Sequence, residues 1–171
     1  TMRDKVKGML MGVVLGDALG MAVESKTAKE ISEKYGRITD FVSTDGHKYF
    51  DGVSPGTWTD DTQLTLVTAE AMIASNGKVD MKSIADAHCS AFKQSVRGWG
   101  RTTREAIAKL VTGESYKESG QYGVGNGVCM KVAPLAAYHA TLKKWPDIAA
   151  LWEAVADFGK MTHLSNLSVL S

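Results

Sequence analysis

The fold class is decided by residues 60–77, which read DDTQLTLVTAEAMIASNG. Leu64, Val67 and Ala71 recur at intervals of three and four residues, which is the spacing of one buried face of an α-helix. A glycine follows the last apolar turn, at a place where helices commonly end. The stretch therefore predicts a long helix over residues 60–76 that begins with two adjacent aspartates.

Helical spacing continues on both sides of this stretch, and no segment shows the alternation of a β-strand. Gly8, Gly12 and Gly16 form a small-residue strip in the N-terminal helix that would let a second helix approach closely. Pro134 marks either a kink or the beginning of a helix. The other expected helices run from about residue 6 to 21, from the Thr27–Glu30 capping box to Tyr35, from Asp80 to Val96, from the Thr102–Glu105 capping box to Val111, and from Trp145 and Pro146 to Phe158. With a long polar loop at residues 36–58, the sequence predicts an all-α fold in a single domain that covers the whole chain.

The composition is that of an ordinary soluble globular protein. The 171 residues suit one domain, and 44% hydrophobic and 23% charged residues with a net charge of +1 exclude a disordered or strongly basic chain. We therefore expect no nucleic acid partner. Cys89 and Cys129 lie far apart without metal-type spacing, so we expect free thiols in a reducing compartment.

The N-terminal segment has the basic start and apolar run of a signal peptide, because Arg3, Lys5 and Lys7 precede GMLMGVVLGDALGMAV. Asp17 interrupts that run, and a carboxylate is costly inside a bilayer. No other apolar stretch reaches the roughly 18 residues of a membrane span. The sequence thus favours a cytoplasmic protein with no membrane partner.

The two aspartates at the start of the predicted helix allow two interpretations. In the first, Thr59 or Asp60 is an N-cap and the other acid supports the first turn, because free backbone N–H groups and the helix dipole stabilise carboxylates there. In the second, the adjacent carboxylates of Asp60 and Asp61 and a neighbouring hydroxyl supply oxygen ligands to Mg²⁺, which prefers such ligands. The residues by themselves leave both interpretations open.

Two further segments carry polar groups that suit a site. GVVLGDALGMAVE, residues 12–24, places Asp17 on an apolar helix face, where a buried carboxylate needs a backbone N–H or a basic partner, and ends on Glu24. GVGNGVCMK, residues 123–131, surrounds Asn126 with glycines ahead of a helix, which makes a backbone-lined concavity suited to phosphate oxygens. Its spacing matches neither the dinucleotide-binding fingerprint nor the P-loop.

Taken together, these segments resemble the ADP-ribosylglycohydrolase family, the group of the dinitrogenase reductase-activating glycohydrolase and the ADP-ribosyl-acceptor hydrolases. Four segments match in the family's order: GVVLGDALGMAVE, GTWTDDTQLTL, GNGVCMKVAPLA and MTHLS. The resemblance implies a compact multi-helix fold that lacks the family's C-terminal part. It also implies a hydrolase that cleaves the N- or O-glycosidic bond between ADP-ribose and a protein side chain or small molecule.

The resemblance implies roles for the acidic residues. Thr59, Asp60 and Asp61 match the first ligand cluster of a site for Mg²⁺ or Mn²⁺ that is binuclear in the family. Glu24 matches an acid beside the metals and the scissile ribose, so the expected catalytic residues are Glu24 and the two aspartates. Carboxylates and a metal-activated water suit a reaction that develops positive charge on the sugar, with Glu24 or an aspartate as general base.

The implied substrate-binding residues lie in the last two segments. Gly125, Asn126, Gly127 and Met130 match the loop that contacts ADP-ribose, and His163 matches a histidine close to the substrate. The expected partner is therefore an ADP-ribosylated protein or small molecule.

The chain departs from the family pattern at two places. Lys131 stands where many relatives carry arginine, and at a phosphate this would exchange a bidentate fork for a point charge. The family's second ligand cluster, a late Asp-x-Asp-Thr stretch, has no counterpart in the sequence. We therefore expect a missing C-terminal segment or a homo-oligomer to cover the core. Two function classes follow: an active hydrolase, or a catalytically impaired ADP-ribose-binding or structural relic.

Overall fold

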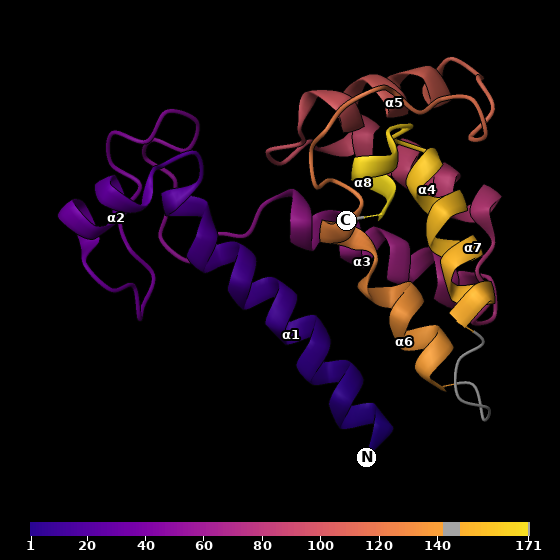
Figure 1. Cartoon of the computed structure of the whole chain (residues 1–171), viewed down its shortest axis with the longest axis horizontal. Helices are drawn as coiled ribbons and strands as arrows, with labels where there is room; N and C mark the ends of the chain where they lie inside the picture. Colours follow the sequence, from indigo (N-terminus) through magenta and orange to yellow (C-terminus); the bar gives the residue numbers. More distant parts are fainter. Residues whose placement is uncertain (142–147, 171) are drawn as a thin grey trace.

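The computed structural model describes residues 1–141 and 148–170 and confirms an all-α architecture (Figure 1). Within these residues the only β-type pairing is an isolated parallel bridge between Gln121 and His163. The helices are α1 (Met2–Gly20), η1 (Met21–Val23), α2 (Ala28–Tyr35), α3 (Asp60–Ala74), α4 (Met81–Gln94), α5 (Arg101–Val111), η2 (Cys129–Lys131), α6 (Ala133–Thr141), α7 (Ile148–Lys160) and α8 (Asn166–Leu170). The expected start of the last long helix at Trp145 and Pro146 lies outside the described residues.

Helix α3 is the centre of the main helical body, and it packs against α1, α4, α6 and η2. Its inward residues belong to two apolar clusters, and both clusters include fully buried side chains from neighbouring helices. The first cluster contains Ala71, Met72, Ile84, Ala85, Val128, Leu135, Phe158 and Met161, and the second contains Leu64, Ala91, Trp99 and Ile107. The period-based prediction of the buried face of α3 is therefore confirmed at Leu64 and Ala71, and Val67 is partly buried against the second cluster.

Helix α1 leads away from this body toward α2 and the long loop, which lie together at the far end of the molecule (Figure 1). The prediction that its glycine strip receives a second helix is wrong for the described residues. A Cβ added at Gly8, Gly12 or Gly16 would meet nothing within 4 Å. The apolar neighbours Met11 and Leu15 are likewise exposed.

One helical segment among the described residues, Met2–Val23, is long and apolar enough to cross a membrane by length and composition alone. A core helix or a signal sequence passes the same test, and only 17% of the most apolar window is buried. The cytoplasmic location stays a prediction.

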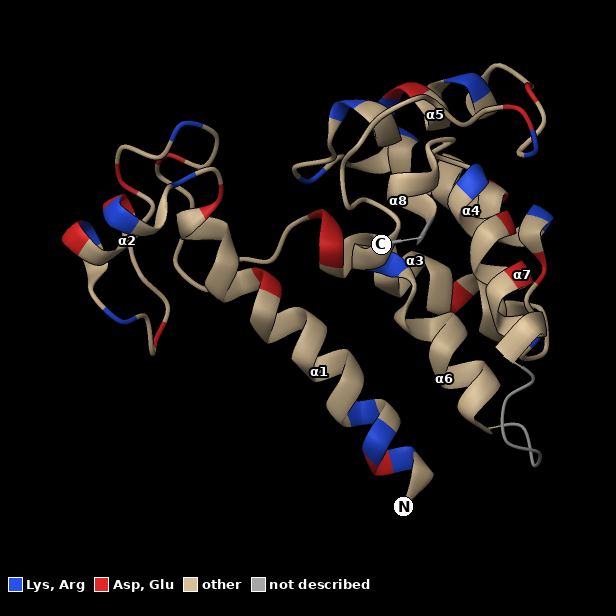
Figure 2. Ribbon diagram, viewed as in Figure 1, with Lys and Arg blue, Asp and Glu red and all other residues tan. Residues whose placement is uncertain are grey.

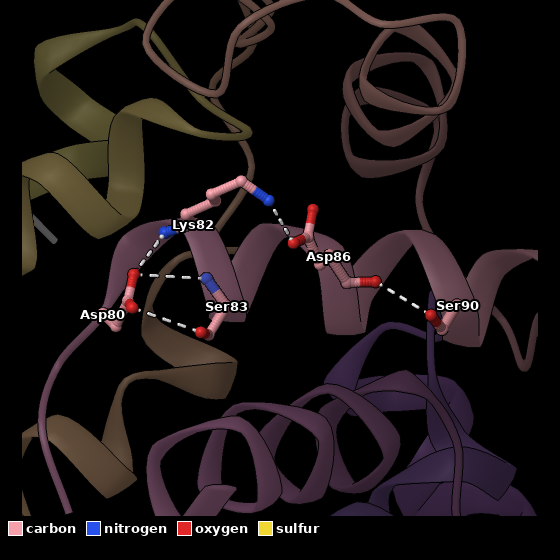
Figure 3. A network of polar contacts seen from close by, with 5 residues as sticks. All are labelled: Asp80, Lys82, Ser83, Asp86 and Ser90. Carbon is pink, nitrogen blue, oxygen red and sulfur yellow. Dashed lines mark hydrogen bonds and ion pairs between the residues drawn. The ribbon is translucent and has the colours of Figure 1, made fainter. Parts of the chain in front are cut away.

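The helix ends follow the local sequence signals in most places. The capping box at Thr27 and Glu30 is confirmed, with both reciprocal hydrogen bonds formed. Asp80 caps α4 by accepting hydrogen bonds from the backbone N–H groups of Lys82 and Ser83 (Figure 3). Helix α4 ends at Gln94, two residues before the predicted end.

The capping box predicted at Thr102 is wrong. Helix α5 already begins at Arg101, with Gly100 as its N-cap and no capping side chain. The Thr102 hydroxyl packs instead against Gly123, where an added Cβ would lie 2.5 Å from Oγ1. Pro134 is the second residue of α6, which confirms that it marks the beginning of a helix.

Candidate active site

The start of α3 is capped by a residue from another helix. Thr59 is the N-cap by position, but its side chain caps nothing in α3. The Asp17 carboxylate of α1 takes that place: its Oδ2 accepts the backbone N–H of Thr59 at 2.8 Å and that of Thr62 at 3.0 Å. The Thr59 hydroxyl donates to the other oxygen, Oδ1, at 2.6 Å. The backbone N–H partner expected for Asp17 is confirmed, and these bonds fix α3 to α1. Figure 2 shows acidic positions in red along α1 and at the start of α3.

This tertiary cap leaves the carboxylates of Asp60 and Asp61 free for another role. Neither they nor Glu24 form an ion pair or a side-chain hydrogen bond within the described residues, although all three line one cavity. Burial and then the adjacent Asp61 carboxylate raise the pKa of Asp60 to about 7. Burial and then Asp17 raise the pKa of Asp61, and burial raises that of Glu24. Burial and the neighbouring carboxylates thus both disfavour the ionised forms of Asp60 and Asp61.

Glu24 is placed by a histidine that the sequence reasoning missed. His47, buried in the 36–58 loop, contacts the Glu24 carbonyl oxygen through Nε2 at 3.0 Å. Its Nδ1 accepts the backbone N–H groups of Tyr49 and Phe50, both at 3.1 Å. Nδ1 therefore carries no proton, and Nε2–H is the donor to Glu24. The sequence offered one signal for this role, a histidine within the long polar loop.

Gln63, in the first turns of α3, holds in place the link between α4 and α5 that lines the site. Its Nε2 donates to the Ser95 carbonyl at 2.9 Å, and its Oε1 accepts the Trp99 indole N–H at 2.7 Å. These bonds fix the link between α4 and α5, which includes Gly98 at a φ of +75°. A Cβ at Gly98 would lie 3.4 Å from Asp60 Oδ1, so this link passes beside the acids. The sequence analysis assigned neither Gln63 nor Gly98 to the site.

The glycine-rich loop and the histidine of the last matched segment come together. The Gln121–His163 bridge joins the glycine-rich loop to the segment after α7. In it, the Gln121 N–H donates to the Thr162 carbonyl at 3.1 Å. Gly127 lies directly against the imidazole, since an added Cβ would be 2.7 Å from His163 Cε1 and 3.0 Å from Nε2. Neither Gly125 nor Gly127 has a positive φ. Gly127 is therefore required for space and not for backbone conformation.

The backbone N–H groups of Gly125, Asn126 and Gly127 donate to no acceptor among the described residues. All three residues line the cavity that holds the acids, and Met130 and His163 line it as well. Free N–H groups that line a cavity suit phosphate oxygens. The predicted substrate-binding residues are thus brought together with the predicted catalytic residues.

This cavity has a volume of about 600 Å³, within the range of small-molecule sites. A second cavity of about 760 Å³ adjoins it, and the two share six lining residues, which include Glu24, Thr59 and Arg101. The second cavity is lined by aromatic and basic side chains, with the Arg97 guanidinium 4.1 Å from the centre of the Trp58 ring. An acidic compartment and an aromatic, basic compartment therefore lie side by side.

Lys131 lines neither cavity, so the condition for the arginine comparison, a contact with a bound phosphate, is not met there. Its side chain is fully buried, with Nζ 3.2 Å from Thr162 Oγ1 and 5.0 Å from the Phe158 ring centre. Burial lowers the pKa of Lys131 to about 7. Lys131 therefore belongs to the interior beneath His163.

The donor set fits a hard cation in part. Carboxylate oxygens of Asp60 and Asp61 are the ligands that Mg²⁺ prefers, and the Thr59 hydroxyl keeps its lone pairs free because it donates its proton to Asp17. Among the described residues, no group of three or more His, Cys, Asp or Glu side chains is arranged to hold a metal ion. The chain thus presents part of a ligand shell.

A family model for ADP-ribosylglycohydrolase matches residues 1–171. The chain belongs to the ADP-ribosylglycohydrolase family. One relative is the ADP-ribosyl-[dinitrogen reductase] glycohydrolase of Rhodospirillum rubrum. It is 28% identical over 155 residues, and the match covers 85% of this chain and 49% of the relative. The ADP-ribosylarginine hydrolase Tri1 of Pseudomonas putida is 28% identical over 178 residues, covering 97% of this chain and 43% of the relative.

A solved structure titled ADP-ribosylglycohydrolase-related protein complex has the same fold, with a TM-score of 0.74 at 26% identity. The match covers 99% of this chain and 52% of that one. The chain spans about half the length of the curated relatives it matches.

Proposed function

We propose that this chain takes part in metal-dependent hydrolysis of the glycosidic bond between ADP-ribose and a nitrogen or oxygen atom of a protein side chain or small molecule. The observation that carries the proposal is the shared cavity: the unpaired carboxylates of Glu24, Asp60 and Asp61 face the same space as free backbone N–H groups and His163. Acids suit the reacting sugar, and N–H groups suit the pyrophosphate.

Thr59, Asp60 and Asp61 would hold Mg²⁺ or Mn²⁺, and the cation when bound would stabilise negative charge on oxygen near the sugar. Cation binding also favours the ionised form of Asp60, whose pKa burial and Asp61 raise to about 7. Whether one or two ions bind depends on ligands beyond those that the chain presents.

Glu24 is the proposed general base. Its carboxylate is the most exposed of the three, and its pKa is raised by burial, which moves it toward the range where a carboxylate accepts a proton effectively. The His47 contact holds the backbone at Glu24 and so orients the side chain toward the sugar.

The free N–H groups of the Gly125–Gly127 turn are proposed to bind the pyrophosphate, with His163 donating a further hydrogen bond. The adjoining cavity, with its exposed Arg97 and buried Trp99, gives room for the group released from the ribose. Substrate choice among arginine, serine and other acceptors would depend on this second compartment.

The second candidate is an ADP-ribose-binding relic with impaired catalysis. The observation in its favour is the partial ligand shell of the described residues, with no cluster of three or more metal-ligating His, Cys, Asp or Glu.

One experiment separates the two candidates: release of ADP-ribose from ADP-ribosyl-arginine and ADP-ribosyl-serine peptides, with Mg²⁺ or with EDTA. The hydrolase requires Mg²⁺-dependent release that Asp60→Asn abolishes and that Asp157→Asn, a change at an exposed aspartate of α7 outside the cavity, leaves unchanged. Absence of release together with measurable ADP-ribose binding supports the relic. Absence of both refutes the proposal.

A further inference from the structure

A buried hydrogen-bond chain runs beneath the cavity from Lys131 through Thr162 to His163. Lys131 Nζ lies 3.2 Å from Thr162 Oγ1, and the same oxygen lies 2.9 Å from His163 Nδ1. All three side chains are buried, with exposed fractions of 0%, 0% and 2%. Lys131 lies in η2, whereas Thr162 and His163 lie in the segment after α7 that pairs with Gln121.

The direction of these bonds follows from what each group can donate. A lysine nitrogen has N–H donors in both its charged and its neutral form, and Lys131 Nζ donates to Thr162 Oγ1. The hydroxyl proton of Thr162 then has two possible acceptors, His163 Nδ1 at 2.9 Å and the Gly159 carbonyl at 3.5 Å. The shorter contact is the better hydrogen bond, and it places a bare Nδ1 next to the hydroxyl.

The opposite arrangement is less favourable for two reasons. If Nδ1 carried a proton, the Thr162 hydroxyl oxygen would accept two hydrogen bonds, one from Lys131 and one from His163. The hydroxyl proton of Thr162 would then have only the Gly159 carbonyl as an acceptor, at 3.5 Å. A proton on Nδ1 would also turn the positive end of an N–H dipole toward the lysine nitrogen in a low-dielectric interior. Burial and Lys131 lower the pKa of His163 to about 4, so the imidazole is neutral at neutral pH and carries one proton.

We propose that Lys131 and Thr162 are positioning residues that fix His163 as the tautomer with its proton on Nε2, presenting a hydrogen-bond donor to an oxygen of the bound ligand. Nε2 lies beside Gly127 on the cavity wall, and it has no hydrogen-bond partner among the described residues. A neutral donor of fixed direction suits a phosphate or ribose oxygen. The ligand part of this inference rests on the proposed function, whereas the tautomer does not.

The burial of Lys131 agrees with a role of this kind. A lysine with no exposed surface is costly unless its donors are used, and the described contacts of its nitrogen are the Thr162 hydroxyl and the face of Phe158. A purely structural position would be filled at lower cost by an apolar residue.

The test is direct observation of the His163 tautomer by long-range ¹H–¹⁵N NMR on the wild-type chain, together with calorimetry of ADP-ribose binding. The expected spectrum shows an unprotonated Nδ1 and a protonated Nε2. Thr162→Ser keeps the hydroxyl and should preserve both tautomer and affinity. Thr162→Val and Lys131→Met should each yield a mixture of tautomers and bind ADP-ribose about tenfold more weakly, as for loss of one hydrogen bond.

A wild-type spectrum with the proton on Nδ1 would overturn the inference. So would a Thr162→Val chain that folds and keeps both the wild-type tautomer and the wild-type affinity. If Thr162→Val does not fold, the wild-type spectrum and the comparison of Lys131→Met with Thr162→Ser decide. Failure of the wild-type chain to bind ADP-ribose, with the expected tautomer present, refutes the ligand and leaves the positioning of His163 standing.

Discussion

Replacing Asp17 with alanine tests whether the acidic site depends on a cap supplied from α1. The substitution removes an acceptor of three hydrogen bonds, from the N–H groups of Thr59 and Thr62 and from the Thr59 hydroxyl. Thr59 and Thr62 are 6% and 1% exposed, so water cannot readily replace the carboxylate. The first turn of α3 would be left with buried, unsatisfied donors.

The expected loss is larger than for an ordinary N-cap. A cap substitution costs roughly 0.5–2 kcal/mol, and hydrogen bonds to charged groups contribute about 1.5–3 kcal/mol each before compensation by relaxation. We expect the free energy of unfolding to fall by about 3 kcal/mol, which for a chain of this size corresponds to a melting temperature lower by about 6–12 °C. Mg²⁺ binding should weaken as well, because Asp60 and Asp61 lie in the turn that loses its cap.

Asp80→Ala is the matched control, because Asp80 also accepts two backbone N–H groups at a helix start but is exposed and local (Figure 3). It should cost about 1 kcal/mol and leave Mg²⁺ binding unchanged. Urea unfolding monitored by circular dichroism measures both variants. Equal losses for Asp17→Ala and Asp80→Ala would refute the idea that a buried tertiary cap holds the site.

Two further predictions concern the acids and the glycine-rich loop. In metal-free buffer, Asp60 has a pKa of about 7 in the folded chain and about 4 when unfolded, so its contribution to stability is present below about pH 4 and is lost as the pH rises through 7. Wild-type stability should therefore fall relative to Asp60→Asn between pH 4 and 8 in urea titrations, and parallel curves would contradict the raised pKa. Gly127→Ala should cost about 1–3 kcal/mol and weaken ADP-ribose binding, because its Cβ would overlap the buried His163 ring. Gly125→Ala is the control, because a Cβ added at Gly125 meets nothing within 4 Å, and it should change neither stability nor binding in the same unfolding and calorimetry measurements. Equal effects of Gly125→Ala and Gly127→Ala would show that local movement relieves the crowding at Gly127.

Local pattern was sufficient to predict most of the longer helices and the acid pair of the candidate site. The spacing of Leu64, Val67 and Ala71 fixes a helix irrespective of its surroundings, and Asp80 caps its own helix through neighbours two and three positions away. The acid pair at Asp60 and Asp61 was visible for the same reason, since adjacent carboxylates at a helix start are a local feature.

The remaining features depend on contacts between distant segments, which a local pattern does not encode. Asp17 and Thr59 are separated by 42 positions, and His47 reaches Glu24 across 23. The prediction of a capping box at Thr102 failed because α5 begins one residue earlier, and the Thr102 hydroxyl lies against the distant Gly123 instead. Likewise, the spacing of three glycines in α1 predicts which face of the helix has small side chains, but it does not predict whether another helix packs on that face.

The cap from Asp17 also sets an order of events in folding. A helix whose first turn has no cap of its own frays at that end, so the turn containing Asp60 and Asp61 gains order only after α1 docks. Until α1 docks, the carboxylates of Asp60 and Asp61 are hydrated, and water weakens their mutual repulsion. Amide hydrogen exchange at Thr59 and Thr62 would thus report the docking of α1, while the amides farther along α3 report the helical body itself.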